Sequence, residues 1–215
     1  MPAIDPALPT ATTLFALAAL LIAKRRGSHL GVWISKPIAA AGFVVLALVT
    51  GALNTPYGAV ILLGLVLSMA GDVLLIPENN DKTFKAGLVS FLLGHVAYAA
   101  AFLSIGVDFQ AAGIALVAVV VIGRAVLRWL TPNVDTDMRV PVLAYTIVIS
   151  SMLVAATGAA SLHDRPDIFV GALLFYLSDF AVARDKFVAP GFWNGAWGLP
   201  FYFVAQLILA FGAHI

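Results

Sequence analysis

The amino-acid sequence predicts an all-α fold: an integral membrane bundle of about eight transmembrane helices. Of the 215 residues, 62% are hydrophobic and only 11% are charged, whereas a typical soluble domain carries about 25% charged residues. A water-soluble chain this short could not hide so much apolar surface in its core, so the excess is expected to face lipid. The charges also cluster between long apolar runs, which is typical of membrane helices joined by short loops.

A spanning helix needs about 20 apolar residues, and eight runs approach that length. The first is short and ends at Lys24, Arg25 and Arg26. The turn at residues 54–56 separates the second run from the third, and the polar segment at 77–81 closes the third. The expected spans are residues 8–23, 37–53, 57–76, 86–105, 111–130, 139–161, 167–183 and 194–213.

The positions of Lys and Arg predict the orientation, because cytoplasmic loops carry an excess of both. If the first loop is cytoplasmic, eleven of the twelve cations lie on that side and only Arg165 lies outside. Both termini are then expected outside the cytoplasm, in a bacterial inner (cytoplasmic) membrane. The first apolar run lacks a basic region before it, which disfavours a cleaved signal peptide, and residues 1–215 are expected to form a single transmembrane domain.

Ionisable residues inside a bilayer are costly and usually face the interior of the bundle. Asp72 and Asp179 each lie about one turn from the cytoplasmic end of a span, and His95 lies two to three turns into the fourth span. Lys36 precedes Pro37 and is expected at the cytoplasmic rim. Residues from distant parts of the chain thus share one depth, which predicts one buried pocket open to the cytoplasm or the inner leaflet.

Neutral polar residues are expected in the same region. Tyr98 shares the face of His95, while Tyr145, Tyr202 and Gln206 fall in the cytoplasmic half or near the midplane. Small residues at 87, 90 and 94 would let a neighbouring helix approach closely.

Taken singly, these residues also have structural explanations. Either aspartate could pair with a rim cation such as Lys36 or Arg184, and His95 could be a packing residue. The three ionisable groups at one depth favour a functional site instead.

Two carboxylates in a dry pocket suit acid–base hydrolysis. One can stay protonated as a general acid, while the other, ionised, stabilises a cationic intermediate or orients water. His95 could activate the water. The chain has no cysteine, and its histidines lack the spacing of a metal site, so neither metal nor cofactor is expected. A zinc site would have to be built from His95 and the two aspartates, with an open position. The net charge of +1 gives no indication of nucleic-acid binding.

Several segments resemble the motifs of the YhhN-like lysoplasmalogenases. These are Gly71-Asp72-Val73-Leu74-Leu75, Gly94-His95-x-x-Tyr98, Gly171-Ala172-Leu173-Leu174-Phe175-x-x-Ser178-Asp179, Lys36-Pro37, and Tyr202 with Gln206. The resemblance implies an eight-helix enzyme that hydrolyses the vinyl ether bond of lysoplasmalogens. Its products would be a fatty aldehyde and glycerophosphocholine or glycerophosphoethanolamine.

On this resemblance, the expected catalytic residues are Asp72, Asp179 and His95, with either aspartate as the acid. The expected substrate-binding residues are Lys36, Tyr98, Tyr145, Ser178, Tyr202 and Gln206. The expected partners are the lysophospholipid substrate, whose phosphate would lie near Lys36, and membrane lipid.

Two other functions compete with hydrolysis. A proton-coupled transporter of a small molecule or lipid would also use intramembrane Asp and His, and the matching intervals Gly64–Asp72 and Gly171–Asp179 would suit an internal repeat. However, the ionisable groups stop near the midplane. A bundle that binds lipid without chemistry would tolerate Asp→Asn substitutions.

Overall fold

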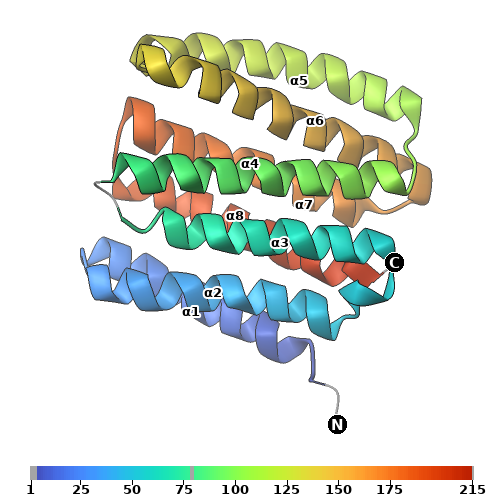
Figure 1. Ribbon diagram of the computed structural model, residues 1–215, viewed down its shortest axis with the longest axis horizontal. Coiled ribbons are helices and arrows are strands. Elements are labelled where there is room, and N and C mark those ends of the chain that lie inside the picture. Colours follow the sequence, from blue (N-terminus) through green and yellow to red (C-terminus); the bar gives the residue numbers. More distant parts are fainter. Residues whose placement is uncertain (1–3, 78–79, 215) are drawn as a thin grey trace.

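The computed structural model describes residues 4–77 and 80–214, and within these ranges it confirms the all-helical fold. Eight helices are long and apolar enough to cross a membrane, so the protein is an integral membrane protein (Figure 1). The helices are α1 (Ala7–Arg25), α2 (His29–Val49), α3 (Pro56–Leu74), α4 (Asp81–Ser104), α5 (Phe109–Leu130), α6 (Arg139–His163), α7 (Pro166–Ala183) and α8 (Phe192–Phe211).

Consecutive helices form four antiparallel hairpins, α1–α2, α3–α4, α5–α6 and α7–α8. α8 lies centrally, because it contacts α1, α2, α3 and α7. α5 lies at the edge, where it packs mainly on α6 and buries only Val119, Gly123 and Leu130 (Figure 1). The helices that surround the centre of the bundle are therefore α2, α3, α4, α6, α7 and α8.

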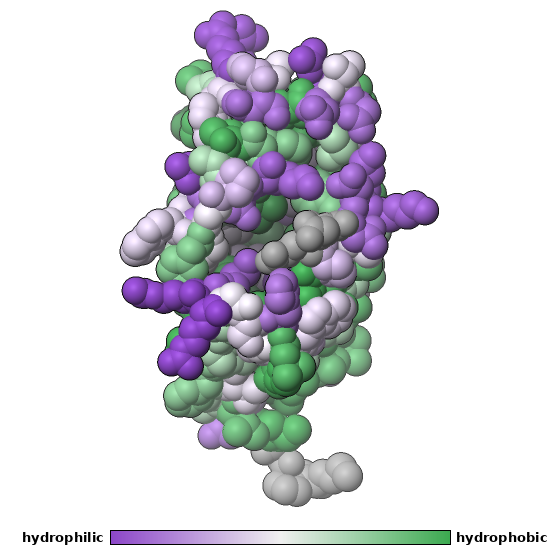
Figure 2. Space-filling view, turned by 90° about the vertical axis from the view of Figure 1, so that its left-hand side faces the viewer, coloured by the Kyte–Doolittle hydropathy of each residue, from purple (hydrophilic) through white to green (hydrophobic). Residues whose placement is uncertain are grey.

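The four hairpin connections lie together at one end of the bundle, which we call the basic end. Both termini lie at the opposite end (Figure 1). Hydrophilic side chains gather on the basic end, and the surface is hollowed near its centre (Figure 2). Of the twelve Lys and Arg residues, all within the described ranges, only Arg165 lies toward the termini.

The second helix differs from the prediction. It was expected over residues 37–53, with Pro37 at its start, but α2 runs from His29 to Val49 and contains Pro37. The Ser28 hydroxyl caps the helix by accepting a hydrogen bond from the Gly31 N–H, at 3.2 Å. The expectation that Lys36 lies at the rim was therefore wrong, because Lys36 lies about two turns inside α2 and is buried.

The other helices begin and end within a few residues of their expected bounds. α4 starts five residues early, because Asn80 caps it: the side chain accepts hydrogen bonds from the N–H groups of Lys82 and Thr83. Part of the segment expected to close the third span, residues 78–79, lies outside the described residues.

Close contact between α3 and α4 depends on small residues, as expected from residues 87, 90 and 94. The Ser90 hydroxyl donates to the Leu67 carbonyl at 2.7 Å, directly across the helix pair. The ring of Tyr98 in α4 packs directly against Gly64 of α3. A Cβ added at Gly64 would come within 2.5 to 2.8 Å of three ring atoms of Tyr98. The position of Tyr98 thus depends on the absence of a side chain at residue 64.

We expect Gly64→Ala to destabilise the protein by about 1–3 kcal/mol, because the added methyl group overlaps the buried Tyr98 ring. Thermal unfolding in detergent measures the effect. The matched control is Gly113→Ala in α5, where an added Cβ meets no atom within 4 Å and better helix propensity stabilises by about 0.5–1 kcal/mol. Equal unfolding temperatures for the two variants would contradict the packing argument.

Candidate active site

Asp72 of α3 lies in a buried ion pair. The Lys36 ammonium nitrogen is 3.2 Å from Asp72 Oδ1 and donates to the main-chain carbonyl of Asp72 at 2.9 Å. The Tyr202 hydroxyl donates to Oδ2 at 2.6 Å. Each carboxylate oxygen therefore has a hydrogen-bond donor or a cation beside it, and only 3% of the side chain is exposed. This arrangement stabilises an ionised carboxylate.

Asp179 of α7 has different neighbours. Its Oδ2 accepts a hydrogen bond from the Tyr145 hydroxyl at 3.1 Å and lies 3.4 Å from Nε2 of His95. The other ring nitrogen of His95, Nδ1, lies 2.7 Å from the Phe91 carbonyl oxygen. The Asp179 side chain is 16% exposed, against 1% for His95, so Asp179 is the more accessible of the two carboxylates.

Aromatic rings connect the two carboxylates into one site. The centroid of the Phe175 ring lies 4.2 Å from that of His95 and 5.4 Å from that of Tyr202. Phe91 packs edge-on against both Phe175 and Tyr202. The polar groups thus lie among closely packed rings, where a low local dielectric strengthens every charge interaction.

A further polar layer lies one helical turn farther from the basic end. The Tyr98 hydroxyl donates to Gln206 Oε1 at 2.6 Å. Gln206 Nε2 and the hydroxyl of Ser68 are buried without a hydrogen-bond partner among the described residues. Ser68 was not anticipated, although it lies one turn from Asp72 on the same helical face.

The structure therefore brings together eight of the nine residues expected from the sequence. Ser178 is the exception: its hydroxyl donates to the Phe175 carbonyl of its own helix, at 2.7 Å. Arg184 does not pair with an aspartate of the cluster and instead donates to Asn194. The clustered residues are Lys36, Asp72, His95, Tyr98, Tyr145, Asp179, Tyr202 and Gln206, and their individual roles stay predictions.

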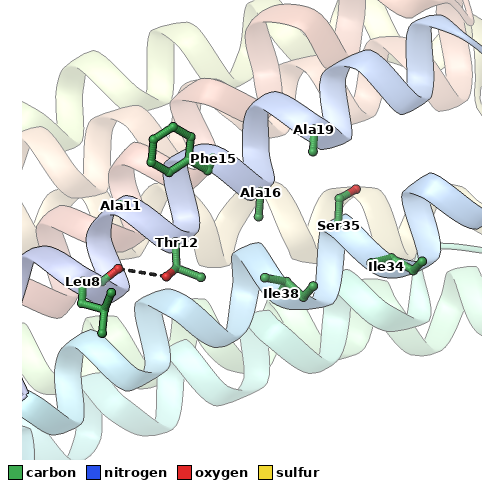
Figure 3. A pocket seen from close by; sticks show the side chains of 9 residues that line it. All are labelled: Leu8, Ala11, Thr12, Phe15, Ala16, Ala19, Ile34, Ser35 and Ile38. Atoms are coloured by element: carbon green, nitrogen blue, oxygen red, sulfur yellow. Dashed lines mark hydrogen bonds between the residues drawn. The ribbon is translucent and has the colours of Figure 1, made fainter.

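Two further observations describe the surroundings of this site. Within the described ranges, no three His, Asp or Glu side chains are arranged to hold a metal ion. A groove of about 480 Å³ lies elsewhere, between α1 and α2. It contains none of the clustered residues and opens among exposed apolar side chains (Figure 3). Its lining is Leu8, Ala11, Thr12, Phe15, Ala16, Ala19, Ile34, Ser35 and Ile38.

The fold and the cluster define the class: a polytopic membrane protein with two carboxylates, an imidazole and an ammonium in one buried cluster. The chain belongs to the YhhN family, whose model matches residues 31–213. All the clustered residues lie within that match, and the whole of α1 lies before it.

Curated relatives carry a functional name. The chain is 31% identical over 167 residues to "Lysoplasmalogenase TMEM86A" of Bos taurus, covering 75% of this chain and 68% of that one. It is 29% identical to "Lysoplasmalogenase" of Mycobacterium tuberculosis (69% and 58% covered) and 31% identical to "Lysoplasmalogenase TMEM86B" of Homo sapiens (69% and 61%). The matches thus span 58% to 68% of these relatives' lengths. No solved structure matches the chain.

We expect Lys36→Met to destabilise the protein by about 3–5 kcal/mol, because it leaves the Asp72 carboxylate buried without its cation. The double variant Lys36→Met/Asp72→Asn should recover much of that loss, since it also removes the charge. Thermal unfolding of both single variants and the double variant gives the coupling energy. Additive effects would show that the pair does not interact.

Proposed function

We propose that the protein is a lysoplasmalogenase: a membrane hydrolase that cleaves the vinyl ether bond of a lysophospholipid. The products would be a fatty aldehyde and glycerophosphocholine or glycerophosphoethanolamine. The names of the relatives support the substrate class. The observation that carries the chemistry is the pair of differently partnered carboxylates in one buried cluster.

The reaction needs the groups that the cluster supplies. A vinyl ether is hydrolysed by protonation at carbon, which gives an oxocarbenium ion that water captures. Protonation of carbon demands a positioned acid, and the cation is stabilised by a nearby fixed negative charge. Asp72 and Asp179 are the two carboxyl groups available, and His95 contacts one of them.

The direction of the substrate follows from the polarity of the bundle. Its phosphate would lie at the basic end, and its alkyl chain would extend among the apolar helices. The Lys36 ammonium, expected from the sequence to meet the phosphate, is held by Asp72. Lys24 is exposed at the end of α1 and lies beside α8, since its Cδ is 3.7 Å from the place that a Cβ on Gly195 would take. We therefore assign the phosphate to Lys24, with Lys36 as a second cation behind it.

The basic end would face the cytoplasm, since Lys and Arg concentrate there. The protein would then lie in a bacterial inner membrane with both termini outside the cytoplasm. The substrate would reach the site from the cytoplasm or the inner leaflet.

The decisive test is aldehyde release from lysoplasmalogen by the purified protein, with and without a chelator. We expect release in both cases, and a decrease of about 100-fold or more in kcat for Asp72→Asn, Asp179→Asn and His95→Ala. In D₂O the aldehyde should carry one deuterium on the carbon beside its carbonyl group, because protonation occurs at carbon.

The matched control is Asp137→Asn, an exposed aspartate at the basic end, which should keep full activity. Thermal unfolding of each variant separates lost chemistry from lost folding. If the wild-type protein releases no aldehyde from either head-group class, the hydrolase proposal fails, and liposome transport assays become the next experiment.

We expect Lys24→Gln to raise KM about 5-fold or more with little change in kcat, because a phosphate contact made equally in the ground and transition states affects binding alone. Steady-state kinetics measure both constants. Arg26→Gln, two residues farther on at the C-cap of α1, serves as the control. An unchanged KM in Lys24→Gln would remove Lys24 from the phosphate site.

A further inference from the structure

The hydrogen-bond partners of His95 fix where its protons lie. Nδ1 lies 2.7 Å from the Phe91 carbonyl oxygen, deep in the bundle. A carbonyl oxygen can only accept a hydrogen bond, so Nδ1 carries a proton. This assignment follows from the hydrogen-bond network, since the partner determines the tautomer.

The proton on Nδ1 determines what can lie between His95 and Asp179. In the neutral ring, Nε2 then has a lone pair, and Nε2 lies 3.4 Å from Asp179 Oδ2. Nε2 has no other hydrogen-bond partner among the described residues. A lone pair this close to an ionised carboxylate in a buried site is repulsive. The contact between Nε2 and Oδ2 is stable only if a single proton lies between them. That proton belongs either to the ring, as imidazolium with carboxylate, or to the carboxyl group, as neutral imidazole with carboxylic acid.

Asp72 is not in this situation. A Lys ammonium and a Tyr hydroxyl occupy its two oxygens, so it has donors on both sides and needs no proton of its own. Its closed surroundings contrast with the partial exposure of Asp179. The two carboxylates are therefore inequivalent: one is enclosed by a lysine and a tyrosine hydroxyl, and the other contacts a histidine.

We propose that Asp179 is the general acid of the site, that His95 holds its proton in place, and that Asp72 is the permanently ionised group that stabilises the cation. This role assignment rests on the proposed hydrolase function. Tyr145, which donates to the same oxygen of Asp179, is a positioning residue. The sequence alone treats the two aspartates as equal, and their neighbours distinguish them.

The assignment gives a balanced reaction. The O–H bond of Asp179 breaks as the C=C π electrons form a C–H bond at the vinyl carbon farther from the ether oxygen. The positive charge is shared by the other vinyl carbon and the ether oxygen, near Asp72. Water adds to that carbon and returns one proton to the Asp179–His95 pair. The hemiacetal then breaks its C–O bond to give the aldehyde and the glycerol hydroxyl, and the site ends with the proton with which it began.

The proton on the pair can be observed without any activity. The chain has four histidines, and His29→Gln, His163→Gln and His214→Gln leave His95 as the only one. In ¹⁵N-histidine NMR of this variant, we expect Nδ1 to be protonated, and the Nε2 resonance to move on Asp179→Asn but not on Asp72→Asn. An unprotonated Nδ1, or an Nε2 resonance that ignores Asp179, would overturn the proton-sharing pair.

Activity then tests the roles. Both Asp→Asn variants are impaired, but Asp72→Asn should keep at least about 10-fold more aldehyde release than Asp179→Asn, since removing the proton donor abolishes the first step and removing the anion only raises its barrier. Equal residual rates, or the opposite order, would overturn the assignment. If wild-type protein releases no aldehyde, the hydrolase proposal fails, whereas the NMR result on the pair is unaffected.

Discussion

The buried ion pair between Lys36 and Asp72 is the constraint on which the rest of the site depends. Neither charge could lie alone at this depth in a membrane bundle, because desolvation would cost several kcal/mol for each. Together, with the Tyr202 hydroxyl as a further donor, they join α2, α3 and α8 at one level. The central position of α8 follows from this contact as well as from apolar packing.

The aromatic residues around the pair have a second consequence. Phe91 and Phe175 separate the surroundings of Asp72 from those of Asp179 while keeping both in one cluster. Identical side chains can then have different chemistry, because each responds to its own nearest donors and not to an average environment. Paired carboxylates with distinct roles in other enzymes are distinguished in the same way.

The fold could be predicted from the sequence because apolar runs and cation positions report directly on lipid contact. The grouping of site residues could be predicted because depth along a helix fixes which groups lie at one level. The partners could not, since whether Lys36 meets Asp72 or Asp179 depends on how α2 packs. The depth predicted for Lys36 was wrong. A proline often marks the first turn of a helix, but Pro37 lies inside α2. Phe91 was not anticipated, and Phe175 was noted only as part of a motif, because an aromatic residue that lines a site in a membrane chain resembles any other apolar residue of that chain.

The peripheral place of α5 links the site to the bilayer. α5 packs mainly on α6, and the rest of its apolar surface is exposed, as expected for a helix that faces lipid. α6 carries the Tyr145 hydroxyl that bonds Asp179. Helices held mainly by lipid adjust their tilt to the thickness of the hydrocarbon layer. A change in bilayer thickness would thus act first on the α5–α6 hairpin, which carries the hydroxyl that bonds the more open carboxylate.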